Sequence, residues 1–203
     1  MYRQKRLPAD KRKKMILRAA IDVFSESNYR VARISDIAAR AEVTDPMIYK
    51  FFDSKKELFM EILMITNRKS IELYGVHNFI TEDSFDNIQN LRTAFKKFLL
   101  MYFESMKKYR KELKIFYQAI SEIDDPDIQR VIRGTYENIV NMMVPILEKA
   151  VDKGILSGRL EPEMIAWDII GFTIQQNALF LAGLYSVKNA ERLLNERMES
   201  WFA

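Results

Sequence analysis

Residues 34–52, ISDIAARAEVTDPMIYKFF, decide the fold, because two short helical patterns meet there at a tight turn. In the first pattern, apolar residues at positions 34, 37, 38 and 41 share one helical face. The second begins at Thr44, which we expect to cap the helix with its hydroxyl, and it places Pro46 in the first turn, where a missing N–H costs nothing. Ile48 and Phe52 face inward. The remaining residues of the second pattern therefore point away from the small core.

Two helices this short, joined by so few residues, are typical of the helix-turn-helix motif, whose second helix enters the DNA major groove. The longer run from Ile16 to Leu63 resembles the DNA-binding domain of the tetracycline-repressor (TetR) family of bacterial transcription regulators. The matching segments are ILRAAIDVFSESNY, SDIAARAEVT, MIYKFF and DSKKELF.

The resemblance implies an all-α fold of about nine helices, with an N-terminal three-helix DNA-binding domain and a C-terminal helical ligand-binding and dimerisation domain. We expect residues 1–56 to form the first domain, including a basic N-terminal arm, and residues 57–203 the second. A helix that starts after Ser54 and runs to about Tyr74 would link them. Ser54 and Glu57 fit a capping box at its start.

The resemblance also implies which residues contact DNA. It gives phosphate contacts to positions 33, 44, 49 and 55, and base reading to positions 45, 46, 47 and 50. The predicted DNA-binding residues are Arg33, Thr44, Asp45, Pro46, Met47, Tyr49, Lys50 and Lys55.

Two of these residues have alternative interpretations. Asp45 repels phosphate but suits a helix N-terminus, so we favour a helix-dipole role over a bond to cytosine. Tyr49 could instead be a half-buried ring that packs on the first helix, expected at about residues 10–27.

The basic N-terminal arm also has two interpretations. Arg3, Lys5 and Arg6 could reach a minor groove, or they could form a solvated tail.

Two positions depart from the family pattern at turns where glycine is usual. Asn28 follows the first helix, and asparagine tolerates a left-handed backbone. Glu42 lies in the turn of the motif, where a positive φ would cost roughly 1 kcal/mol.

Charge is distributed unevenly along the chain. Residues 1–56 hold fourteen Lys and Arg against seven Asp and Glu, a net of +7, so the remainder of this +4 chain is net −3. A basic end joined to a mildly acidic body is typical of a nucleic-acid-binding domain fused to one of another function, although a solvated basic tail explains the charge equally well.

The second half contains four long helical patterns, expected at about residues 86–109, 110–123, 126–153 and 162–187. Pro145 should break or kink the third of these near Asn141. The fourth is apolar on more than one side, but Asp168 and a Gln-Gln-Asn run argue against a membrane span. Burial on two sides fits a helix between its own core and a partner subunit. The resemblance implies a homodimer, and the predicted interface residues are Trp167, Ile170, Ile174, Ala178, Leu181, Leu194 and Trp201.

A cluster of aromatic and methionine residues fits an adaptable apolar cavity, although each residue alone is better explained as ordinary core. The resemblance favours a small effector there, such as a long-chain or aromatic compound. The predicted ligand residues are Phe95, Phe98, Leu99, Tyr102, Phe116, Met142, Met143, Ile146, Phe172, Gln175 and Gln176.

Composition argues against an enzyme. The chain has no cysteine and a single histidine, His77, in a loop-like stretch, so we predict no catalytic residues, no metal site and no cofactor. Lack of cysteine and of a secretory signal favours the cytoplasm. We expect a homodimeric repressor that binds a palindromic operator and is released by an apolar effector. The alternative is a DNA-associated structural or regulatory protein that acts through a protein partner.

Overall fold

The computed structural model describes residues 8–202, apart from the side chains at positions 70, 73 and 74. The basic residues Arg3, Lys5 and Arg6 lie outside this range. The regular elements of the described residues are all helical: nine α-helices and two short 3-10 helices. The predicted all-α fold is confirmed.

The chain forms two compact units, and neither is continuous in sequence. The first comprises Met1–Thr66 and Lys111–Val131, and the second comprises Asn67–Arg110 and Ile132–Ala203. The boundaries fall inside α4 (Lys55–Tyr74) and α7 (Pro126–Asp152), so each of these helices contributes to both units. The domain boundary expected after Lys56 stays a prediction.

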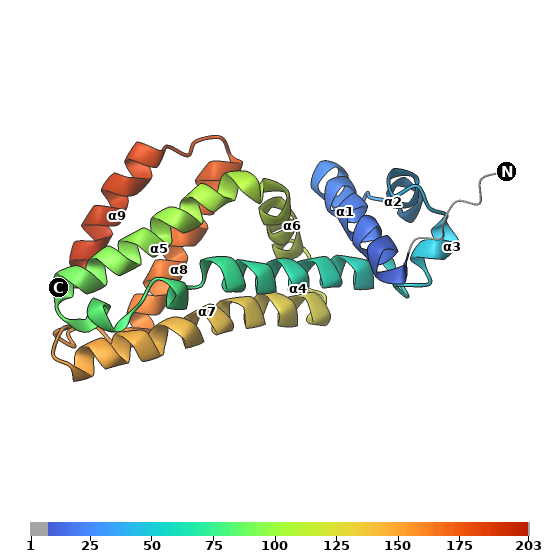
Figure 1. Ribbon diagram of the computed structural model, residues 1–203. Helices are drawn as coiled ribbons and strands as arrows, with labels where there is room; N and C mark the ends of the chain where they lie inside the picture. The colour runs from blue at the N-terminus through green and yellow to red at the C-terminus, as the bar shows by residue number, and fades with distance from the viewer. Residues whose placement is uncertain (1–7, 203) are drawn as a thin grey trace. The chain divides into compact units, whose positions relative to one another are not determined.

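The first unit contains α1 (Ala9–Ser27), α2 (Ile34–Arg40), α3 (Asp45–Ile48), the start of α4 and most of α6 (Arg110–Ile120). Figure 1 shows α2 beside α1, and α3 next to α2. The core of this unit consists of fully buried apolar side chains from these helices, among them Ile16, Phe24, Ile37, Ile48, Phe52, Leu58, Phe59 and Ile62. The rings of Phe24 and Phe59 pack edge to face, with centroids 5.3 Å apart.

Both turn positions that depart from the family pattern have a positive φ. Asn28, which follows α1, has φ 76°, and Glu42, between α2 and α3, has φ 52°. The Asn28 N–H donates to the carbonyl of Phe24 and so closes the last turn of α1. The chain therefore adopts the backbone that the turns require without glycine.

Only one of the two predicted N-caps forms as expected. Ser54 Oγ accepts a hydrogen bond of 3.0 Å from the Glu57 N–H, so this cap of α4 is confirmed, whereas the Glu57 carboxylate accepts from the N–H of Asp53 instead of completing a capping box with Ser54. Thr44 occupies the N-cap position of α3 with an extended backbone, but its hydroxyl makes no capping bond. The Met47 N–H bonds to the Thr44 backbone carbonyl, so the turn closes through the main chain.

The second unit contains η1 (Val76–Asn78), η2 (Glu82–Phe85), α5 (Ile88–Lys108), most of α7, α8 (Pro162–Leu181) and α9 (Val187–Trp201). Helix α5 packs against η1, η2, α8 and α9. The buried core of the second unit includes Leu91, Phe95, Leu99, Met143, Leu147, Ile169, Leu194 and Phe202.

Helix α7 continues through Pro145, and the proline leaves the Asn141 carbonyl without its helical donor, whereas the predicted kink stays a prediction. Pro145 and Asn141 both lie on the solvent side, so water can satisfy this carbonyl. One prediction for this unit was wrong, because helix α8 ends at Leu181 instead of near Val187. Gly183 has φ 76°, and the Ser186 hydroxyl accepts a bond from the Asn189 N–H, so this side chain starts α9.

Among the described residues, no helix combines the length and apolar character that crossing a membrane would need.

Candidate nucleic-acid interface

The α3 region presents a polar surface that its own packing fixes. Ile48 is completely buried, and Phe52 is buried beside it after the following turn. Tyr49 has 51% of its surface exposed, and the alternative interpretation, a half-buried ring packed on α1, stays a prediction. The other exposed side chains of this surface are Thr44, Asp45, Pro46 and Lys50. Because Ile48 and Phe52 point into the core, this surface keeps a fixed direction.

Met47 differs from its neighbours because it is half-buried. Its sulfur accepts a hydrogen bond from Arg12 Nη1 at 3.7 Å, which joins α3 to the first turns of α1. The Met47 side chain therefore has less rotational freedom than the exposed side chains of α3. This restriction favours a defined position for its terminal methyl group.

Arg33 and Lys50 are the exposed cations of this predicted set. Arg33 occupies the N-cap position of α2, where its side chain makes no capping bond. Within residues 8–202, neither cation has an ion-pair partner, whereas Arg40 pairs with Glu26 at 2.8 Å. Arg33 and Lys50 are thus free to bind an external anion.

Lys55 has a different environment from the one that the family pattern implies. Its ammonium donates to the backbone carbonyls of Tyr29, Arg30 and Ala32 at 2.9, 3.1 and 3.0 Å. The side chain is half-buried, and its Nζ lies 4.9 Å from the centre of the Tyr29 ring. The structure therefore places Lys55 against the connection between α1 and α2.

Helix α6 and the turn after it contact the end of α1 and the connection that follows. No sequence motif indicated these contacts. Gln118 Nε2 donates to the Phe24 carbonyl at 2.9 Å, and Gln118 Oε1 accepts from the Tyr29 N–H at 3.2 Å. Lys114 donates to the Ser25 carbonyl, and Arg30 forms an ion pair with Glu122 at 2.7 Å. The end of α1 is therefore capped by side chains from α6, about 90 residues away in sequence.

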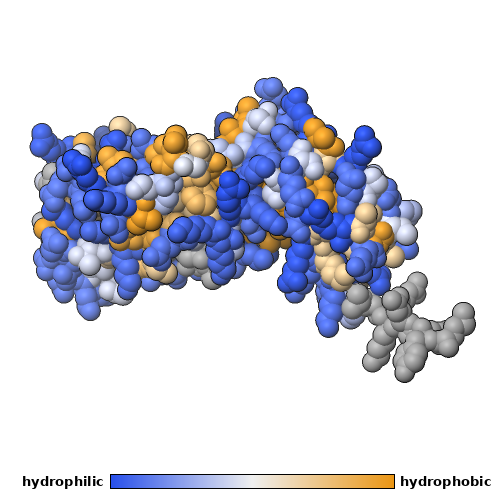
Figure 2. Space-filling view, turned by 90° about the horizontal axis from the view of Figure 1, so that it is seen from above, coloured by the Kyte–Doolittle hydropathy of each residue, from blue (hydrophilic) through white to orange (hydrophobic). Residues whose placement is uncertain are grey.

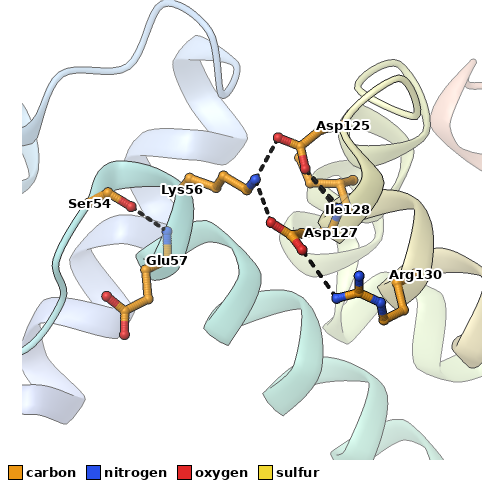
Figure 3. A network of polar contacts seen from close by, with 7 residues as sticks. All are labelled: Ser54, Lys56, Glu57, Asp125, Asp127, Ile128 and Arg130. Atoms are coloured by element: carbon orange, nitrogen blue, oxygen red, sulfur yellow. Dashed lines mark hydrogen bonds and ion pairs between the residues drawn. The ribbon is translucent and has the colours of Figure 1, made fainter.

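Lys56 anchors the start of α4 to the turn between α6 and α7, as Figure 3 shows. Its Nζ lies between carboxylate oxygens of Asp125 and Asp127, at 2.7 Å from each, and Asp127 also bonds Arg130 at 3.1 Å. The hydrogen bond from Lys56 holds the pKa of both carboxyl groups below the ordinary value, and these bonds raise the pKa of Lys56. Sequence analysis missed this cluster, because two acidic residues near a helix start are equally typical of helix capping.

In the second unit, the predicted ligand residues have mixed environments. Phe95 packs on Phe202 with ring centroids 5.0 Å apart, and Phe172 packs on Trp201 at 5.8 Å, as in an ordinary core. Phe98, Leu99, Met143 and Gln176 are buried, whereas Tyr102, Met142 and Ile146 are half-buried. Gln175 is exposed, and Phe116 belongs to the first unit.

This core contains one hydrogen-bonded pair of polar side chains and one buried amide donor that has no acceptor among the described residues. Tyr102 and Asn177 bond each other through the Tyr102 hydroxyl, at 3.0 Å to Oδ1 and 2.8 Å to Nδ2. Burial raises the pKa of Tyr102 to about 12, although the bond from Asn177 opposes the shift. Gln176 is only 1% exposed, and its Nε2 has no hydrogen-bond partner among the described residues. A buried amide donor without an acceptor is costly.

The predicted interface residues divide by burial. Ile170, Leu194 and Trp201 are buried within their own chain, and Trp201 Nε1 donates to Asp168 at 2.6 Å, so none of the three is accessible to a partner. Ile174 and Leu181 are half-buried, and Trp167 and Ala178 are exposed. A groove of about 310 Å³ lies at the junction of the α7–α8 loop with α8 and α9, lined by Leu156, Ser157, Gly158, Arg159, Leu160, Ile165, Ser200 and Trp201.

Comparison with known proteins agrees with this geometry. Residues 16–62 match the family model described as "Bacterial regulatory proteins, tetR family". The HTH-type transcriptional activator FasR of Mycolicibacterium smegmatis is 27% identical over 181 residues, which are 88% of this chain and 76% of FasR. The uncharacterized HTH-type transcriptional regulator YhgD of Bacillus subtilis is 30% identical over 151 residues, 74% of this chain and 73% of YhgD.

Solved structures share the fold along the whole chain. The fatty acid degradation regulator FadR from Bacillus halodurans has a TM-score of 0.75 at 17% identity, over 98% of this chain and 97% of that one. At such identity the likeness concerns the fold alone. Together with the exposed α3 surface and the relative at 30% identity, the match shows that this chain belongs to the TetR family of bacterial regulatory proteins and is a DNA-binding transcription regulator, not an enzyme.

Proposed function

We propose that the protein is a homodimeric repressor that binds a palindromic operator through the exposed surface of α3 and is released by a largely apolar effector. The observation that carries the proposal is the fixed surface of Thr44, Asp45, Pro46, Tyr49 and Lys50 above the buried Ile48. On this surface Tyr49 and Lys50 offer a hydroxyl and an ammonium for phosphate or base edges, and Pro46 offers an apolar contact for a thymine methyl.

Arg33 adds a second cation from the start of α2. In the proposed complex it binds a phosphate, together with Thr44 and Tyr49, and these contacts orient α3 in the groove. Asp45 serves mainly as a helix-dipole partner, since it lies in the first turn of α3. Met47, held by Arg12, contributes an apolar contact to the base edges.

An apolar stripe on α8 that begins with exposed side chains supports the homodimer. Met164 and Trp167 are 61% and 43% exposed, and the same stripe continues at intervals of three and four residues through Gly171, Ile174, Ala178 and Leu181. Such spacing lets two antiparallel helices pack closely. Figure 2 shows hydrophobic areas among the hydrophilic atoms of the face that it presents. A dimer would space two α3 surfaces for successive major grooves, about 34–36 Å apart.

The buried core of the second unit supports the proposal that an effector binds there. Gln176 offers an N–H without an acceptor, so a ligand with a carbonyl, carboxylate or hydroxyl oxygen would satisfy it. Buried residues of the second unit such as Met143 and Phe172 suit an apolar remainder. Gln175, Phe116 and the residues of the α7–α8 groove are not part of this proposal.

The test is selection of bound sequences from a random duplex pool by the purified protein at two salt concentrations. Enrichment of one motif with two inverted half-sites is expected. Diffuse enrichment whose affinity collapses with salt would contradict the operator proposal and favour a structural DNA-associated protein.

The sign of regulation needs a separate measurement, because the relative FasR is named an activator. A reporter gene placed behind the selected motif should fall in expression when the protein is produced. A rise would show activation instead. Adding candidate apolar carboxylic acids should restore expression, because the ligand must prefer the DNA-free state by about 5 kcal/mol to reverse a 99:1 population.

A further inference from the structure

We propose that Lys55 is a positioning residue for DNA binding, which holds the connection between α1 and α2 (residues 28–33) in its binding conformation and does not itself contact a phosphate. The inference rests on the proposed DNA-binding function. It differs from the role that the family pattern implies for this lysine.

The donor capacity of Lys55 is fully used. A lysine ammonium has three N–H donors and no acceptor. The three carbonyls of Tyr29, Arg30 and Ala32 lie at 2.9–3.1 Å from Nζ, so each donor has one acceptor. A phosphate contact would require at least one of these bonds to break, and that would leave a carbonyl of the connection without its charge-assisted donor.

Neighbouring side chains hold the lysine in this position. The Tyr29 ring lies under Nζ at 4.9 Å, and it packs in turn on the Phe59 ring of α4 at 4.2 Å. On the far side, Gln118 accepts the N–H of Tyr29. The connection is therefore fixed by α4 at its carbonyls and by α6 at the N–H of Tyr29.

The consequence for DNA binding passes through Arg33. This residue follows directly after Ala32, and its own carbonyl accepts the first bonds of α2, from the N–H groups of Asp36 and Ile37. The conformation of the connection thus determines the position at which α2 begins. It also determines the position of the exposed Arg33 side chain. Lys55 acts on the phosphate contact of Arg33 through the backbone.

The experiment compares Lys55→Arg, Lys55→Met and the reference Arg33→Met with the parent, in full-length protein on the selected duplex across a range of salt. Arginine keeps the charge and binds phosphate at least as well as lysine, but its planar fork does not converge on three carbonyls. We expect Lys55→Arg to bind about tenfold more weakly, because it lacks one charge-assisted hydrogen bond. The salt dependence should stay that of the parent.

Lys55→Met should also weaken binding without changing the salt slope, whereas Arg33→Met should reduce the slope by about 0.9 for each phosphate that the variant no longer neutralises. The effects of Lys55→Met and Arg33→Met should be less than additive in the double variant. Undiminished binding by Lys55→Arg, or a slope reduced by Lys55→Met, would overturn the proposal. If Lys55→Met does not fold, Lys55→Arg alone decides the question.

A DNA-free measurement separates this inference from the proposed function. Amide hydrogen exchange of residues 29–33 should be faster in Lys55→Met and Lys55→Arg than in the parent, and unchanged in Arg33→Met. Unchanged exchange in both Lys55 variants would refute the positioning role even if the parent binds an operator. Failure of the parent to select any DNA sequence would refute the proposed function and leave the exchange measurement intact.

Discussion

The side-chain oxygen of Gln118 accepts a hydrogen bond of 3.2 Å from the backbone N–H of Tyr29, although 89 residues separate them in the chain. The same side chain donates to Phe24, four residues before the positive-φ residue Asn28. One amide from α6 therefore satisfies both an acceptor and a donor at the end of α1, where helical partners are missing.

Replacing Gln118 by alanine should destabilise the first unit by about 1–3 kcal/mol, because the Phe24 carbonyl and the Tyr29 N–H would lose their hydrogen-bond partner. Urea unfolding followed by circular dichroism measures the change. The matched control is Gln129→Ala, an exposed glutamine of α7, which should have little effect. Equal stability of the two variants would mean that water replaces the Gln118 bonds at no cost.

Stability in acid should depend on the Lys56 cluster. Because Lys56 holds the pKa values of Asp125 and Asp127 below their ordinary value of 3.8, this contribution is complete above that value and is lost as pH falls through the lowered pKa values. We expect Lys56→Met to be less stable than the parent at neutral pH, and the difference to shrink as pH falls below the ordinary value of 3.8. Thermal unfolding across this range tests it, and a constant difference would exclude a role for the two carboxylates.

Substitutions in α3 should separate positioning from base reading. Tyr49→Ala should weaken binding to all sequences alike, because a phosphate contact carries no sequence information, whereas Met47→Ala or Lys50→Ala should change which sequence is preferred. Selection experiments with each variant provide the measurement. Since Tyr49 is half exposed, the unfolding free energy of the Tyr49→Ala variant should stay close to that of the parent. A changed motif for Tyr49→Ala would move this residue to the base-reading group.

The hydrogen-bonded pair of Tyr102 and Asn177 predicts a late step in the alkaline titration of tyrosine. Burial raises the pKa of Tyr102 to about 12, so its contribution to stability is complete below the ordinary value of 10.0 and is lost as pH rises through the raised value. The Tyr102→Phe variant should lack one tyrosinate that forms near pH 12 by ultraviolet absorbance. Loss of a tyrosinate that forms near pH 10 instead would place the hydroxyl in contact with solvent.

The apolar stripe of α8 predicts an effect of charge on assembly. Met164→Glu should dissociate the proposed homodimer, because it places a carboxylate at the most exposed apolar position of the stripe. Analytical ultracentrifugation of the variant is compared with Glu148→Gln, a change in α7. A parent protein that is monomeric at micromolar concentration would contradict the dimer itself.

Local sequence patterns predicted the local features of this fold. The intervals of Ile34 to Phe52 indicated both helices of the motif. The family resemblance, and not a local pattern, indicated a positive φ at Asn28 and Glu42, because related sequences usually have glycine at these positions. The start of α4 at Ser54 followed from a cap whose two groups are three residues apart. In each case the interacting groups lie within one or two helical turns.

Features that depend on distant partners were not predicted. The carbonyls bound by Lys55 are more than twenty residues away, and Gln118 lies on a helix whose apolar periodicity gives no indication of its polar contacts. The pattern of apolar residues predicted that α8 continues to about Val187, although Gly183 is a typical helix terminator and has a positive φ. Burial of Leu194 and Trp201 within their own chain depends on the packing of α5, α8 and α9, which periodicity alone does not determine.

The discontinuity of the first unit limits how the protein can be dissected. A fragment that ends at Thr66 would contain all of α1, α2 and α3, yet it would lack Gln118, Glu122 and Asp125. The end of α1 would be without the Gln118 side chain that caps it, and Arg30 and Lys56 would be without their carboxylates. Gene fusions that borrow only the N-terminal segment as a DNA-binding module should therefore perform poorly, whereas exchange of the C-terminal half would have to retain residues 111–131 of the original chain.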